Sequence, residues 1–102
     1  MPRLEGNGGS FEVLCSGAVL QKLRDIQRQA TVEGRGEAVL AAIRQVLLRL
    51  RHGPMEFGEP LYFLPALRMH LRHGGIGPLF IDFAVCEDHS LVFVKGATLL
   101  AK

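Results

Sequence analysis

The chain has 102 residues, of which 48% are hydrophobic and 22% charged, and its formal net charge is +2. This length is sufficient for one domain with a single core, and the composition excludes a disordered chain. No apolar run approaches the roughly 20 residues that a membrane-spanning helix needs, and the N-terminal residues lack the apolar centre of a secretory signal, so we expect a cytoplasmic protein that does not enter membranes.

The N-terminal part divides into a lead-in and a first strand. Residues 1–10 contain three glycines and one proline, and we expect them to form a flexible lead-in to a single domain over residues 11–102. Residues 11–15 predict a short strand, because the apolar side chains of Phe11, Val13 and Cys15 alternate with their neighbours. Ser16 is the expected N-cap of the helix that follows.

Two amphipathic helices are predicted next, over residues 18–32 and 37–51. Apolar residues recur in both at the spacing of one helix face. The connector Gly34-Arg35-Gly36 is so short that the two helices should form an antiparallel hairpin. Gly53-Pro54 is a strong signal for the end of the second helix.

Three strands complete the predicted fold, over residues 61–72, 79–86 and 91–94. Pro65 cannot donate to a strand ladder, so it indicates a bulge or a strand that begins after it. Residues 74–78 predict an open, glycine-rich hairpin loop. The order strand, helix, helix, strand, strand, strand predicts a two-layer α+β fold (β-α-α-β-β-β), with the helical hairpin packed on one face of a mainly antiparallel sheet.

The two cysteines, Cys15 and Cys86, lie in apolar strand-like runs. We expect both to be buried free thiols, because free cysteine behaves as a small hydrophobic residue. No pattern of Cys and His has the spacing of a zinc site, so no metal or other cofactor is predicted.

The charge distribution is uneven. Residues 17–54 contain seven Lys and Arg against three acidic residues. A basic helical half permits an anionic partner, either nucleic acid or an acidic peptide. Solvated helix faces with no partner explain the same charges.

One candidate site lies in the predicted strand 61–72. Strand alternation places three basic side chains on one face, which we expect to point away from the helices, and Lys95 could reach the same surface. Asp82 joins them if that face takes the even positions of the next strand. Histidine and arginine together suit acid/base work on a phosphodiester, or binding of an RNA backbone. A solvent-facing surface in which Asp82 pairs with an arginine is the alternative. The candidate catalytic residues are Arg68, His70, Arg72 and Lys95.

Four short segments carry a resemblance to a known family. They are Gly53-Pro54, Gly58-Glu59-Pro60-Leu61, Leu67-Arg68-Met69-His70-Leu71-Arg72 and Leu91-Val92-Phe93-Val94-Lys95-Gly96. Together with the element order, they resemble the RelE/ParE toxin superfamily of bacterial toxin–antitoxin modules, and its phage-derived HigB-like branch in particular.

The resemblance implies either a ribosome-dependent endoribonuclease that cuts mRNA or a ParE-like inhibitor of DNA gyrase, with an antitoxin protein as partner. It implies that Arg68 is the functional arginine of the second strand, while Arg72 and Lys95 match more loosely. Two features depart from the family. The third strand reads Pro78-Leu79-Phe80-Ile81-Asp82 in place of a Tyr-Arg-like pair, and the C-terminal aromatic or histidine residue is missing.

These departures leave two other functions open. One is a non-catalytic module of the same fold that binds a protein, with the apolar second face of the central strand as a homodimer or antitoxin interface (Phe80, Ala84 and Cys86). The other is RNA binding through the basic helical hairpin.

Overall fold

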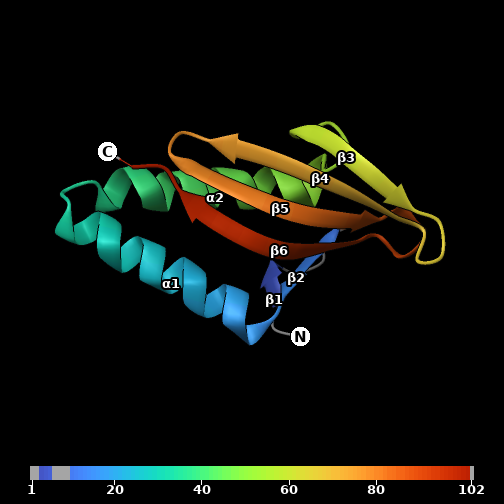
Figure 1. Ribbon diagram of the computed structural model, residues 1–102, viewed down its shortest axis with the longest axis horizontal. Helices are drawn as coiled ribbons and strands as arrows, with labels where there is room; N and C mark the ends of the chain where they lie inside the picture. The colour runs from blue at the N-terminus through green and yellow to red at the C-terminus, as the bar shows by residue number, and fades with distance from the viewer. Residues whose placement is uncertain (1–2, 6–9, 102) are drawn as a thin grey trace.

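The computed structural model describes residues 3–5 and 10–101 of the chain. A helical hairpin packs on one face of a mixed, mainly antiparallel sheet, as the α+β prediction requires (Figure 1). The elements are β1 (Arg3–Glu5), β2 (Glu12–Cys15), α1 (Gly17–Val32), α2 (Gly36–His52), β3 (Glu59–Leu64), β4 (Met69–Ile76), β5 (Leu79–Cys86), the short 3-10 helix η1 (Glu87–His89) and β6 (Leu91–Leu99).

The sheet has the strand order β1-β2-β6-β5-β4-β3. All neighbouring strands are antiparallel except β2 and β6, which run parallel. The early strand β2 therefore pairs with the last strand of the chain, and the helical hairpin is the connection that carries the chain across the sheet. The two edges of the described sheet are β1 and β3.

Both predicted helices are confirmed, with ends that differ by at most one residue. The Ser16 hydroxyl accepts a hydrogen bond from the Val19 amide at 3.2 Å, as an N-cap does. Gly34 has a φ of +78°, which lets the chain reverse between α1 and α2. Among the described residues, no helix combines the length and apolar character needed to cross a membrane.

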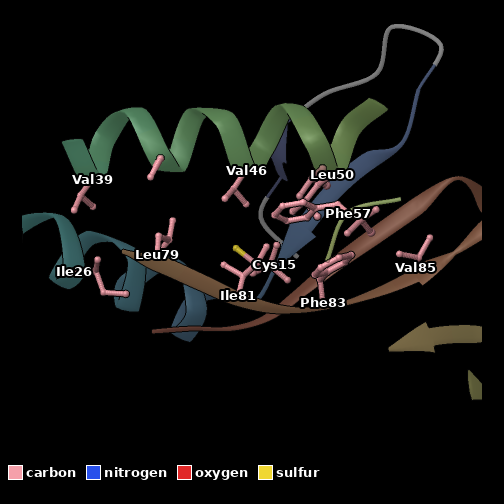
Figure 2. Close-up of a cluster of buried hydrophobic side chains, with 14 of the residues drawn as sticks. Cys15, Ile26, Val39, Val46, Leu50, Phe57, Leu79, Ile81, Phe83 and Val85 are labelled. Carbon is pink, nitrogen blue, oxygen red and sulfur yellow. The ribbon is translucent and has the colours of Figure 1, made fainter. Parts of the chain in front are cut away.

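One hydrophobic core fills the space between the hairpin and the sheet (Figure 2). Val39, Val46 and Leu50 project from α2 toward the sheet, and Phe57 lies beside Leu50 after the helix ends. The sheet contributes the odd-numbered residues of β5, which are Leu79, Ile81, Phe83 and Val85. Cys15 and Cys86 are free and buried, as predicted.

The predicted continuous strand over residues 61–72 is wrong, because two strands and a turn occupy this segment. The alternative, a strand that begins after Pro65, is confirmed, since β4 begins at Met69. Strand β3 ends at Leu64, and the amides of Leu67 and Arg68 bond back to the carbonyls of Leu64 and Pro65. Proline favours the early positions of such a turn, since its φ is already fixed there. Apolar and basic residues alternate through the turn as well, so the sequence pattern does not distinguish the turn from a strand.

The predicted glycine-rich loop over residues 74–78 is also wrong. Strand β4 continues to Ile76, so only Gly77 and Pro78 separate it from β5. Gly74 and Gly75 are strand residues over which aromatic rings lie. A Cβ at Gly75 would lie 2.5 Å from the ring of Phe80. The glycines make room for rings within the sheet.

Two further differences concern the ends of the sheet. Strand β6 extends to Leu99, beyond the predicted end at Val94. Arg3–Glu5, within the predicted lead-in, form β1 and pair with β2, while residues 1–2 and 6–9 of that lead-in lie outside the described residues.

Candidate functional site

The faces of β4 are the reverse of those predicted. Arg72 lies opposite Phe83 and His70 opposite Val85 in the β4–β5 ladder. Phe83 and Val85 are fully buried in the core, and directly opposed residues share a face of the sheet. Arg72 and His70 therefore point toward the helix side, and the predicted basic surface on the other side is not formed.

Arg72 serves to hold the loop between α2 and β3. Its side chain is buried, with 7% of the residue exposed. Nε donates to the Phe57 carbonyl and an Nη atom donates to the Gly58 carbonyl, each at 3.1 Å. These bonds satisfy a guanidinium that would otherwise be costly to bury.

Arg68 and His70 lie at the end of the sheet where η1 follows β5. Arg68 is in the turn with a φ of +52°, and its Nε lies 2.5 Å from a carboxylate oxygen of Asp88. His70 Nε2 lies 3.3 Å from Glu87, and its ring lies against Phe63 with 4.6 Å between centroids. Arg68 thus connects the β3–β4 turn to η1, and His70 connects β4 to η1.

The face of the sheet away from the helices, called the open face below, carries an apolar row. Five side chains lie in register across five adjacent strands and share this face, because each pairs directly with the next. An antiparallel sheet with one solvated face normally presents polar residues there. The apolar row consists of Tyr62, Leu71, Ala84, Phe93 and Leu14.

Lys95 stands beside the apolar row. Asp82 pairs with Gly96 and Phe83 pairs with Val94, which leaves Lys95 as the additional residue of a β-bulge. Lys95 is exposed. Within the described residues, its ammonium group makes no ion pair. Of the four candidate residues, Lys95 alone lies on the open face.

A pair that the sequence reasoning did not assign lies on the same face. His73 Nδ1 and a carboxylate oxygen of Asp82 are 2.6 Å apart, and Phe80 stacks on the imidazole with 5.4 Å between centroids. Asp82 therefore pairs with a histidine and not with Arg68 or Arg72. A prediction of a two-residue turn at Gly77-Pro78 would have placed His73 opposite Asp82. Gly74 and Gly75 instead indicated a loop, so the sequence did not reveal that β4 continues to Ile76.

Three further observations concern metal ligands, Cys15 and the helical hairpin. No group of three or more His, Cys, Asp and Glu residues in the described ranges could hold a metal ion. Burial raises the pKa of the Cys15 thiol above its ordinary value of 9.0, so this cysteine is a neutral core residue near pH 7. On the basic hairpin, Arg28 and Arg35 pair with Asp25 and Glu33.

No family model matches the chain, and neither a curated protein nor a solved structure matches it.

Proposed function

We propose that this chain is the toxin-like component of a bacterial toxin–antitoxin module and that it acts by binding a protein through the open face, without cutting RNA. The element order, with a helical hairpin on one side of the sheet, supports the toxin-like part. The apolar row is the observation that supports binding through the open face.

The dispersal of the basic residues favours binding over cleavage. A phosphodiester-cleaving site needs an acid or base and a cation within reach of one phosphate group. The Arg72 guanidinium donates to the Phe57 and Gly58 carbonyls, while Arg68 and His70 lie beside acidic residues at the end of the sheet. Lys95 is on the other face, so the four candidate residues do not form one site.

The exposed apolar surface favours a protein partner. Tyr62 and Leu67 are 61% and 60% exposed, and both border the open face. Contiguous apolar surface of this kind is characteristic of protein interfaces, whose centres are rich in aromatic residues. An RNA surface would instead be lined by several unpaired cations.

Induced expression in a bacterium tests this proposal with three forms of the protein. We expect growth arrest by the parent and by an Arg68→Ala/His70→Ala variant, because neither residue lies on the open face. We expect Phe93→Glu to abolish the arrest, since it places a charge within the apolar row. Circular dichroism of each purified variant checks that it is folded.

The antitoxin or target is then sought by comparison of parent and Phe93→Glu in quantitative co-purification. Growth arrest that depends on Arg68 and His70, with cut mRNA detected by end mapping, would support the endoribonuclease instead. A parent that causes no arrest would contradict the toxin-like function.

A further inference from the structure

Strand β3 forms one edge of the described sheet and is exposed on both of its faces (Figure 1). Tyr62 lies on the open face, because it is opposite Leu71, and Phe63 lies on the helix side, because it is opposite His70. Leu61, Tyr62 and Phe63 are 54%, 61% and 47% exposed, so the helices leave this edge uncovered. Large apolar side chains therefore stand in solvent on both sides of one strand.

The main chain of β3 also lacks a partner on its outer side. In an antiparallel pair, an edge strand turns alternate N–H and C=O groups away from its neighbour. Within residues 3–5 and 10–101, the main-chain groups of residues 61–63 bond to no element other than β4. A helix could cover one face of β3 but could not bond to these groups. Another strand is the segment that contacts the edge and both faces together.

Prolines bound the exposed segment at both ends. Pro60 precedes a bulge within β3, and Pro65 follows Leu64, the last residue of the strand. Proline has no N–H, and on an edge strand it stops the addition of a further strand. A ladder on the outer side of β3 is therefore limited to residues 61–64. No Lys, Arg, Asp or Glu lies within that segment, so no charge there repels an apolar strand.

A second copy of this chain meets these limits by symmetry. Two antiparallel copies of residues 61–64 can be centred on Phe63, so that each Phe63 faces its counterpart and each Tyr62 faces Leu64 of the other copy. Opposed residues then share a face, as strand pairing requires, and apolar side chains oppose apolar side chains. The prolines of both copies fall at the ends of the ladder, where a missing N–H costs nothing. Such a self-complementary contact closes after two copies.

We infer that the β3 edge joins two copies of the chain, in an antiparallel pair centred on Phe63 that continues the sheet from one copy into the other. The two-fold axis is perpendicular to the sheet, so both open faces lie on the same side of the dimer. Residues 61–64 bury less than the about 800 Å² per partner of a typical stable interface, so we expect a weak dimer with a Kd of about 10–100 μM. The proposed function does not enter this argument, since Phe63 lies outside the apolar row.

Sedimentation equilibrium of the full-length protein at about 5 to 500 μM tests the inference. We expect the mass of the parent to rise with concentration from 11.2 kDa toward twice that value. Phe63→Lys places two like charges opposite each other at the axis, so it should weaken the dimer about tenfold or more. Leu48→Lys is the matched control, because Leu48 is exposed to nearly the same extent, 46%, but lies on α2. It should leave the dimer unchanged.

A charge exchange tests the register of the pair. Phe63→Glu alone should weaken the dimer as Phe63→Lys does, whereas an equimolar mixture of the two variants should form a dimer at least as strong as that of the parent, because opposite charges then meet at the axis. Unfolded variants would not recover in this way. A parent that stays monomeric, a dimer that survives Phe63→Lys or a mixture that stays monomeric would overturn the inference. A dimer lost in Phe93→Glu but retained in Phe63→Lys would place the contact on the open face and would overturn it as well.

Discussion

Arg72 was predicted to be a catalytic residue on an exposed face, but in the structure it is a buried residue that holds a loop. Strand alternation identified its two faces correctly, but only the pairing with Phe83 decides which face points to the core. An arginine is an unusual core residue, since charged side chains are seldom buried without partners. The partners here are the Phe57 and Gly58 carbonyls of a loop, and no sequence pattern announces them.

We expect Arg72→Met to lower the free energy of unfolding by about 2–3 kcal/mol, because one buried and one partly buried carbonyl lose charged hydrogen-bond donors. The measurement is urea unfolding followed by circular dichroism. Arg68→Ala is the control: its ion pair with Asp88 is exposed, so its removal should cost about 1 kcal/mol or less. Equal losses for both variants would contradict a structural role that is particular to Arg72.

At the scale of elements, the sequence predicts the helices well and the strands only in part. Helical periodicity and the caps are local signals, so α1 and α2 appear where they were expected. Strand ends depend on the neighbouring strand. The length of β4 and the bulge at Lys95 are set by β5, and a single sequence does not reveal that pairing.

The candidate site has the same limitation. The sequence prediction grouped four residues by their type and spacing: Arg68, His70, Arg72 and Lys95. Their faces depend on the turn at Pro65 and on the sheet register, and a shift of one residue moves a side chain to the other face. The apolar row depends still more on the register, since its members come from five strands.

The loop between α2 and β3 is held closely against β4, and Gly58 is where the two backbones meet. A Cβ at Gly58 would lie 2.2 Å from the His73 carbonyl oxygen, and the φ of Gly58 is +73°. We expect Gly58→Ala to destabilise the fold by about 3 kcal/mol or more, because backbone must move and a disfavoured φ must be held. Thermal unfolding measures the loss. Gly17→Ala, where a Cβ meets nothing within 4 Å, should change the stability little, and a comparable loss there would refute the contact argument.

The molecule as a whole encloses the Cys15 thiol in its core, where β2 pairs with β6. Burial raises the thiol pKa in the folded state, so the folded protein retains this proton when the unfolded chain has released it. The contribution to stability is therefore complete below the ordinary pKa and decreases as the pH rises through and above it.

Urea unfolding from about pH 7 to about pH 10 tests this for the parent and for Cys15→Ala. The stability difference between the two proteins should stay constant up to about pH 8 and shrink above it. Other groups titrate equally in both proteins, so the difference isolates Cys15. A difference that stays constant to pH 10 would show that the thiol proton is not linked to folding.

The parallel pairing of β2 with β6 has a consequence for synthesis of the chain. Residues 12–15 leave the ribosome well before their partner residues 91–94 are made. The helical hairpin has local contacts and can form while translation continues, but its apolar side has no complete sheet to cover until β6 arrives. The nascent protein therefore cannot close its core, or complete the apolar row, until residues 91–94 have left the exit tunnel.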